Sequence, residues 1–427
     1  MFKFRIQQLS LEGFRGFEKA TLTFPKNNIL LLIGNNGKGK TSILDSIALL
    51  LSDFVRRVKS EHPKLYPSVQ TTDINKIVKK VRIEGCFETN NDTFKVTLEN
   101  TVASQKKIQE SYHRFLERFT PLNPPVVVPI VAYYKSIRFF KSSKNLGHFP
   151  IWDSDPKTTF ACYNNAFSTH DMTFEDFQTW FRLEEDQEND NIRRFQDFKY
   201  TNYKLDIIRN CINVFFKHLN EKSAIFTDLR VQRIGAKSKL IIQKEAVEFE
   251  LDQLSDGERM LLLCVGDIAR RLTLAQNVPT LDALSGEGIV LIDEIEMHLH
   301  PQWQRTVLSA LNQTFPNIQF IVSSHSTQIL SQVQRESIRI LDNGTILMPS
   351  SNPIGRDANA ILEEIQQVSK RPKAIETLLE AYFTMIHKND FAKANDLKNN
   401  LLNYLDMEDP IFAKAEAMIT RKKMLMP

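Results

Sequence analysis

The chain has 427 residues, a formal net charge of +4, and hydrophobic and charged fractions of 42% and 25%, which indicate a globular protein of two or three domains. The small net charge gives no argument for nucleic-acid binding, and four widely spaced cysteines argue against a disulfide framework or a thiolate zinc site. Without a signal-peptide pattern or an apolar run of membrane-spanning length, we expect a cytoplasmic protein with no membrane partner.

The first predicted elements are strands that lead to a phosphate-binding loop. Residues 2–11 alternate as a strand does, and a second strand ends at 24–25. The apolar run 29–33 then enters Gly34-Asn35-Asn36-Gly37-Lys38-Gly39-Lys40-Thr41-Ser42, which opens an apolar helix. The glycines let backbone N–H groups wrap a phosphate chain at a helix N-terminus. With Lys40 reaching the β- and γ-phosphates and Thr41 completing a Mg²⁺ shell, the loop predicts binding of ATP and Mg²⁺.

Two further strands, 78–87 and 93–98, are predicted after this helix. Arg15, on the turn 12–17 ahead of the phosphate loop, is either a nucleotide contact or a surface residue. The basic stretches 56–59 and 79–82 are either solvated faces or DNA contacts.

The middle of the chain differs in composition. Prolines at 121–129 mark a boundary, and the aromatic-rich residues 136–203 predict a mostly helical insertion, whose acidic run 184–190 we expect on a solvated helix face. Asp153 and Asp155 form either a metal-binding pair or a turn. The basic and aromatic residues of 134–144 form either a nucleic-acid surface or core aromatics with exposed lysines.

Leu254-Ser-Asp-Gly-Glu-Arg259 precedes an amphipathic helix with apolar positions from 261 to 272. One interpretation is a capping box formed by Ser255 and Glu258. A second is that Ser255, Asp256, Gly257 and Glu258 present donors of the helix N-terminus to a γ-phosphate. Both can hold together.

The apolar strand 288–292 ends in Asp293 and Glu294. We expect Asp293 to hold Mg²⁺ through water and Glu294 to orient or deprotonate the attacking water, a role generally worth about 10²–10⁴ in rate. His298 and His300 follow and are either metal ligands or part of a turn. The next apolar strand, 318–323, leads to His325.

The last segments predict a hairpin at 338–346 and a helical region from Gly355 onward. Apolar spacing at 378–386 and 394–405 indicates two amphipathic helices, and Asp409-Pro410 begins a last one. This tail either packs on the core or forms a docking surface for a partner.

These motifs, with Phe14-Arg-Gly-Phe17, resemble the RecF/SMC-like branch of ABC ATPases over about residues 1–130 and 205–350. The resemblance implies an α/β fold: an ABC-ATPase-like P-loop NTPase core with a mostly helical insertion and a helical C-terminal region. The implied domains are 1–130, 131–204, 205–350 and 351–427. In this family the motif matched by 254–258 binds the nucleotide of the opposite subunit, and the turn matched by 295–303 crosses the dimer interface. His325 matches the switch histidine that contacts the γ-phosphate, and Gln70 is the candidate for the glutamine loop at the metal.

The segment 355–364, followed by short helices, resembles PtuA-type ATPases of Septu and retron-associated antiphage systems. The resemblance implies a homo-oligomer of ATP-sandwich dimers that controls an HNH endonuclease partner acting on DNA. Because Asp256 departs from the commonest signature, we expect slow or conditional hydrolysis. Two rivals are a DNA-repair or DNA-clamping ATPase and an overcoming-lysogenization-type nuclease, whose TOPRIM domain needs an Asp-x-Asp pair that residues 350–427 lack.

Overall fold

The fold comes from a computed structural model of the chain. It describes residues 3–59, 66–90, 92–99, 110–119, 127–135, 159–167, 175–219, 226–235, 237–276, 281–356 and 372–425. The chain folds into two compact units, Met1–Arg356 and Asp357–Pro427.

The N-terminal part of the first unit is an antiparallel sheet in the order β2-β1-β4-β5. Its strands are β1 (Phe4–Phe14), β2 (Phe17–Thr23), β4 (Arg82–Thr89) and β5 (Thr93–Glu99). They confirm the strands predicted from alternation. Every second residue of β4 is buried, and buried residues alternate with more exposed ones along most of β1. Helix α2 (Glu110–Glu117) packs against β5.

A second sheet forms the centre of this unit, in the order β13-β12-β3-β11-β10-β6. Its strands are β3 (Ile29–Ile33), β6 (Ile130–Tyr134), β10 (Gly288–Ile292), β11 (Ile318–Ser324), β12 (Ile338–Asp342) and β13 (Thr345–Leu347). All neighbours run parallel except the β12–β13 hairpin. Strands β6, β10 and β11 are buried at every residue, as expected for parallel strands covered on both faces.

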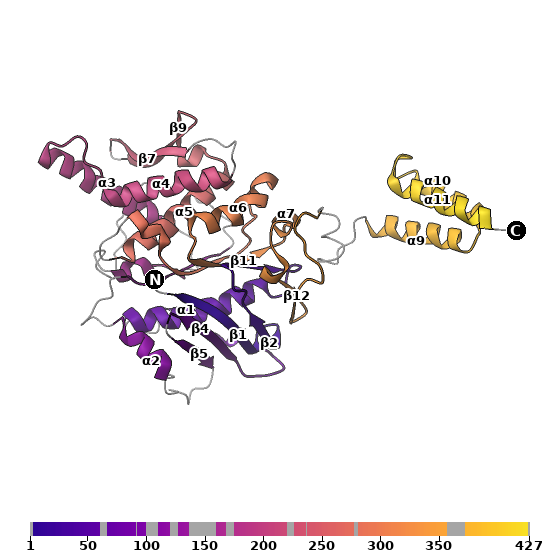
Figure 1. The fold of residues 1–427 in the computed structure, drawn as a ribbon, viewed down its shortest axis with the longest axis horizontal. Helices are drawn as coiled ribbons and strands as arrows, with labels where there is room; N and C mark the ends of the chain where they lie inside the picture. Colours follow the sequence, from indigo (N-terminus) through magenta and orange to yellow (C-terminus); the bar gives the residue numbers. More distant parts are fainter. Residues whose placement is uncertain are drawn as a thin grey trace. The chain divides into compact units, whose positions relative to one another are not determined.

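Helix α1 (Lys40–Lys59) lies between the two sheets and contacts β4 on one side and β10 and β11 on the other (Figure 1). The opposite face of the parallel sheet is covered by α5 (Asp256–Leu274) and α6 (Pro301–Thr314), and α4 (Tyr203–Leu219) packs on these two helices (Figure 1). The predicted helices after the phosphate loop and after Ser255 are therefore confirmed. The short helices of this unit are η2 (Thr71–Asp73), η4 (Leu251–Gln253), η5 (Leu281–Ser285), α7 (Thr327–Leu330) and η6 (Arg335–Ser337).

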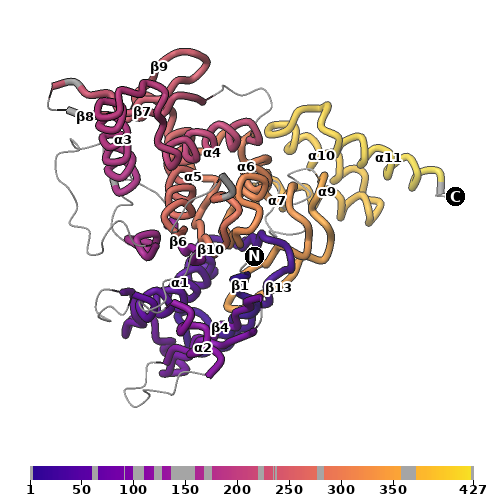
Figure 2. Tube along the Cα trace, turned by 60° about the vertical axis from the view of Figure 1, so that its left-hand side comes forward, coloured from indigo at the N-terminus to yellow at the C-terminus, as the bar shows by residue number. Residues whose placement is uncertain are grey.

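The described part of the insertion is helical, as predicted, with η3 (Thr159–Tyr163) and α3 (Glu175–Phe195). Helix α3 lies with the β7-β8-β9 meander on the side of the unit away from α2 (Figure 2), whereas η3 packs against α5 and β6. The meander consists of β7 (Phe226–Ile234), β8 (Lys237–Lys244) and β9 (Val247–Glu250), which the sequence did not lead us to expect. Residues 130–134 pair with β10 as strand β6, so the expected boundary after residue 130 falls at the start of a core strand.

One prediction for the insertion is wrong. Glu184, Glu185 and Glu188 of the acidic run are buried on α3 rather than solvated. Arg233 Nη1 lies 2.8 Å from Glu185 Oε2, and Lys204 Nζ lies 2.6 Å from Glu184 Oε1. These cations from β7 and α4 compensate the carboxylates, which a reading of α3 alone does not reveal.

The second unit is a small helical bundle with its own core. It contains α9 (Lys373–His387), α10 (Phe391–Leu401) and α11 (Pro410–Leu425), which confirm the predicted helices. The core consists of Leu379, Tyr382, Ile386, Ala394, Leu401, Phe412 and Ala415. Most of the segment 355–364, and the alternatives for Asp153, Asp155 and 136–144, lie outside the described residues.

All four cysteines are free thiols. Of the helices in the described part of the chain, none has both the length and the apolar character that crossing a membrane requires.

Candidate nucleotide-binding site

Three adjacent parallel strands bring the predicted site residues to one edge of the central sheet. β11 lies between β3 and β10, with Ser324 opposite Ile33 and Val322 opposite Ile292. The segments that follow these strands, which are the phosphate loop, Asp293-Glu294 and His325, therefore leave the sheet side by side. The carboxyl edge of a parallel sheet is where ligands bind in such folds.

The phosphate loop has a backbone that only glycine allows. Gly34, Gly37 and Gly39 have φ angles of +150°, +78° and +101°. A Cβ atom on Gly34 would lie 2.5 Å from the Leu341 carbonyl oxygen, and one on Gly39 would lie 2.7 Å from the Phe17 ring. Asn35, Asn36 and Gly37 are exposed. This open cradle of backbone fits a phosphate chain.

Lys40 and Lys38 point to different partners. Lys40 is 6% exposed, and its Nζ donates to the carbonyl oxygens of Gly34 at 2.8 Å and Asn35 at 3.3 Å, so the ammonium lies against the loop. Burial lowers the pKa of Lys40, although Asp293 and Glu294 oppose the shift. Lys38 instead contacts the β12–β13 hairpin, with Nζ 2.8 Å from Asp342 Oδ1.

Thr41 and Asp293 meet as predicted. The Thr41 hydroxyl donates to Asp293 Oδ2 at 3.0 Å, and the Ser323 hydroxyl donates to Asp293 Oδ1. Burial raises the pKa of Asp293 despite these two donors. The hydroxyl and carboxylate oxygens fit Mg²⁺, which usually takes one or two protein ligands and completes its shell with water and phosphate oxygens.

Glu294 has a backbone conformation unusual for a non-glycine residue, with φ of +53°. Such a conformation costs on the order of 1–3 kcal/mol and persists where the surroundings hold it. Here the Glu294 N–H donates to Ser323 Oγ at 2.8 Å. Ser323, which the sequence analysis missed, therefore positions both acids of the pair.

His325 lies at the predicted edge and is half-buried. Its backbone N–H donates to a carboxylate oxygen of Glu296. Burial, together with the nearby Lys40 ammonium, lowers the pKa of the imidazole. A neutral imidazole can donate a hydrogen bond from one ring nitrogen and accept at the other.

Arg15 is an ion-paired residue rather than a free surface cation. Its Nη1 lies 2.7 Å from Asp45 Oδ2 on α1, and its Nε lies 2.8 Å from Asp73 Oδ1. Asp73 in turn accepts from the backbone N–H of Gln70 at 2.9 Å. Arg15 therefore joins the turn before β2 to both α1 and the loop that carries Gln70.

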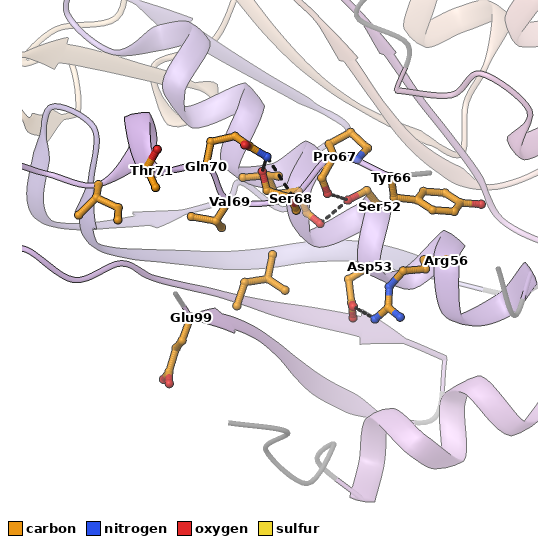
Figure 3. Close-up of a pocket in the computed structure, with 13 residues that line it drawn as sticks. Ser52, Asp53, Arg56, Tyr66, Pro67, Ser68, Val69, Gln70, Thr71 and Glu99 are labelled. Atoms are coloured by element: carbon orange, nitrogen blue, oxygen red, sulfur yellow. Dashed lines mark hydrogen bonds and ion pairs between the residues drawn. The ribbon is translucent and has the colours of Figure 1, made fainter. Parts of the chain in front are cut away.

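Gln70 lies on the flank of α1. Its amide Nε2 donates to the carbonyl and hydroxyl oxygens of Ser68 (Figure 3), and the two distances are 3.0 and 3.1 Å. It lines a cavity of about 520 Å³ whose wall also includes Ser52, Asp53 and Arg56 of α1. The side-chain hydrogen bonds of Gln70 go to Ser68 and not to Thr41 or Asp293, and its metal role stays a prediction.

The capping box at the start of α5 is confirmed. Ser255 Oγ accepts from the Glu258 N–H at 3.4 Å, and the Ser255 N–H donates to Glu258 Oε2 at 3.0 Å. Burial alone would raise the pKa of the Glu258 carboxyl. The hydrogen bonds from Lys244 and Ser255 outweigh the effect of burial, so the pKa is lowered. Ser255 and Asp256 are exposed. Gly257 is required by packing, because a Cβ atom there would lie 2.5 Å from the His298 carbonyl oxygen.

The second of the two histidines after the acid pair serves a helix start. His300 caps α6, its Nδ1 accepting from the Gln302 N–H at 3.3 Å. Among the described residues no cluster of three or more histidine, cysteine, aspartate or glutamate side chains is arranged to hold a metal ion.

These features define the class of protein as one with a P-loop ATPase core. They are a glycine loop between a parallel strand and a helix, a buried lysine, and a threonine in contact with an aspartate at a nearby strand end. A family model described as "AAA domain, putative AbiEii toxin, Type IV TA system" matches residues 29–331. The chain belongs to this AAA-domain family.

Relatives of known name are similar over most of the chain. The retron Vc95 probable ATPase of Vibrio cholerae is 30% identical, covering 93% of this chain and 86% of that protein. The retron Ec83 probable ATPase of Escherichia coli is 27% identical, covering 98% and 87%. The Septu protein PtuA of Bacillus thuringiensis is 24% identical, covering 76% and 72%. Among solved structures, an SMC head bound to the C-winged helix domain of ScpA matches with 15% identity and a TM-score of 0.47, covering 81% of this chain and 98% of that chain.

Proposed function

We propose that this chain is the ATP-binding and ATP-hydrolysing subunit of an antiphage defence complex. The observation that carries the ATPase assignment is the contact of Thr41 with Asp293 at the edge where the phosphate loop, Glu294 and His325 meet. The similarity to retron and Septu ATPases supports the defence setting. The HNH endonuclease partner and its action on DNA rest on the resemblance of residues 355–364.

Each residue of the site has a role in this proposal. The backbone N–H groups of 34–42 bind the phosphates. The Lys40 ammonium gives up its hydrogen bond to the Gly34 carbonyl oxygen and donates to phosphate oxygens instead. Thr41 and Asp293 would hold Mg²⁺, which neutralises phosphate charge when bound. Glu294 takes a proton from the attacking water, and His325 donates a hydrogen bond to the γ-phosphate.

The second half of the site comes from another copy of the chain. Ser255 and Asp256 are exposed at the N-terminus of α5, where N–H groups and the helix dipole favour an anion. We assign Ser255–Glu258 to the nucleotide of the opposite subunit, which gives a homo-oligomer built from ATP-sandwich dimers. Nucleotide occupancy then switches subunit geometry, and a bound nuclease can read that change.

The test uses Glu294→Gln to retain ATP. Hydrolysis should fall by about 10²–10⁴, and ATP with Mg²⁺ should shift the variant to a larger species in sedimentation velocity. Adding Ser255→Arg should abolish that shift while ATP binding persists. Ser255→Ala removes the helix cap without adding a bulky side chain, so it separates the loss of the cap from the steric block. Thr93→Arg adds an arginine at an exposed position on β5 and is the matched control for Ser255→Arg.

Two outcomes contradict the proposal. Brisk turnover by Glu294→Gln removes the role given to that carboxylate. An unchanged ATP-driven shift in the Ser255→Arg variant refutes the shared site.

A further inference from the structure

The strand beside the acid pair brings a cation to the site. β6 is the edge strand of the central sheet and pairs with β10, Tyr134 lying opposite Ile292. The Asp293 N–H donates to the Tyr134 carbonyl oxygen at 2.8 Å. Lys135, the first residue after β6, therefore leaves the sheet next to Asp293.

The side chain of Lys135 stays at this edge. Lys135, Asp293 and Glu294 line one small cavity of about 20 Å³. The Lys135 ammonium lies 3.0 Å from Asp45 Oδ1 and 5.1 Å from the centre of the Tyr133 ring. Its side chain is 35% exposed, so it can move without opening the core.

Asp45 holds this ammonium one helical turn from the predicted metal residue. Thr41 and Asp45 are four residues apart on α1 and share one face, with a rise of about 6 Å between them. Each carboxylate oxygen of Asp45 has its own cation, Lys135 on Oδ1 and Arg15 on Oδ2. If Lys135 leaves, Asp45 keeps Arg15 as a partner.

We propose that Lys135 is a further catalytic residue, which leaves Asp45 and binds the γ-phosphate of the nucleotide. This inference rests on the proposed function. A phosphate group carries more negative charge than a carboxylate that already neutralises Arg15, so it competes successfully for the ammonium. An ammonium has three donors and no acceptor, so Lys135 acts on phosphate oxygens and not as a metal ligand.

The proposal gives the site a means of distinguishing ATP from ADP. Only a nucleotide with a γ-phosphate gains the contact with Lys135. A hydrogen bond to a charged group contributes about 1.5–3 kcal/mol, which corresponds to a preference of about tenfold to hundredfold.

The experiment is isothermal titration calorimetry of the full chain with AMP-PNP and with ADP, both with Mg²⁺. Lys135→Ala should weaken AMP-PNP binding about tenfold to hundredfold and leave ADP binding within about twofold. Lys135→Arg should retain most of the preference, and Lys135→Gln, of similar length without the charge, should lose it. The control is Lys95→Ala on β5, away from the site. It likewise removes an ion-paired lysine, whose Nζ lies 2.9 Å from Glu84 Oε1.

The outcomes separate this inference from the proposed function. If the wild type binds both nucleotides and Lys135→Ala leaves their affinity ratio unchanged, Lys135 has no γ-phosphate role, but the nucleotide site stands. If the wild type binds neither nucleotide, both proposals fail. If Lys135→Ala does not fold, the ratio of AMP-PNP affinity to ADP affinity is compared between Lys135→Arg and Lys135→Gln. Equal ratios in these two variants would show that Lys135 has no γ-phosphate role.

Discussion

Ser323 holds both acids of the candidate site with one hydroxyl group. The hydroxyl donates to Asp293 and accepts from the Glu294 N–H at 2.8 Å, so a single oxygen sets the metal carboxylate and the strained backbone of its neighbour. Such supporting groups determine how accurately a site is preorganised.

Glu287, which precedes β10 at the end opposite the acid pair, predicts a pH dependence of stability. Burial raises the pKa of its carboxyl from 4.5 to about 7. Because the folded state favours the protonated form, the free energy of unfolding falls as the pH rises from about 4.5 through 7. Glu287→Gln should therefore raise the thermal unfolding midpoint at pH 8 and leave it nearly unchanged at pH 4.5.

Differential scanning calorimetry of wild type and Glu287→Gln at these two pH values checks this. Glu18→Gln, which removes an exposed carboxylate from β2, is the control for loss of one charge. A gain of equal size at both pH values would contradict the assigned cause.

At the scale of elements, α5 is fixed by a buried charge cluster. Asp267 Oδ1 accepts from Arg270 at 2.6 Å, and Asp267 Oδ2 accepts from Arg271 Nε and the Tyr134 hydroxyl at 2.8 Å each. Burial would raise the pKa of Asp267, but the two arginines hold it well below its usual range. The Arg271 guanidinium also donates to the Cys162 carbonyl at 2.6 Å. The cluster therefore ties the helix of the capping motif to β6 and to the insertion.

Asp267→Asn should lower the free energy of unfolding by about 3–5 kcal/mol, because it leaves two buried guanidinium groups without a carboxylate. Urea denaturation followed by circular dichroism measures the loss. Asp256→Asn, in an exposed pair with Arg259 on the same helix, should cost no more than about 1 kcal/mol. Similar losses in the two variants would show that the cluster does not stabilise α5.

At the scale of the whole molecule, the chain divides after Arg356. The C-terminal unit buries its own apolar residues, among them Tyr382, Leu401 and Phe412. The elements of the candidate site all belong to the first unit.

A chain ending at Arg356 should consequently fold and bind ATP with unchanged affinity, but lose the HNH partner assigned to it. Nucleotide titration and co-purification with a tagged partner check the two halves of this prediction, with the full chain as the control. Retained co-purification would refute docking through residues 357–427, and loss of ATP binding would refute the independence of the units.

The sequence by itself determined the features that depend on local pattern. The buried strand before Gly34, the acids after Ile292, the box of Ser255 with Glu258 and the helices of the C-terminal unit all follow from neighbouring residues. Backbone geometry and side-chain periodicity act over a few residues, so the presence and type of these elements could be predicted. Their ends were less exact, since α9 begins at Lys373, before the apolar spacing that starts at 378.

Only the tertiary structure decided which distant residues meet. It inserted β11 between β3 and β10, placed β6 in the central sheet and paired the carboxylates of α3 with cations from α4 and β7. It also brought Ser323, Asp45 and Lys135 to the site. Ser323 and Asp45 lie in no recognisable motif, and Lys135 lies in the basic and aromatic stretch 134–144, which was not expected at the nucleotide. Such contacts join residues far apart in the chain, and their energy depends on strand order and burial, which no local pattern contains.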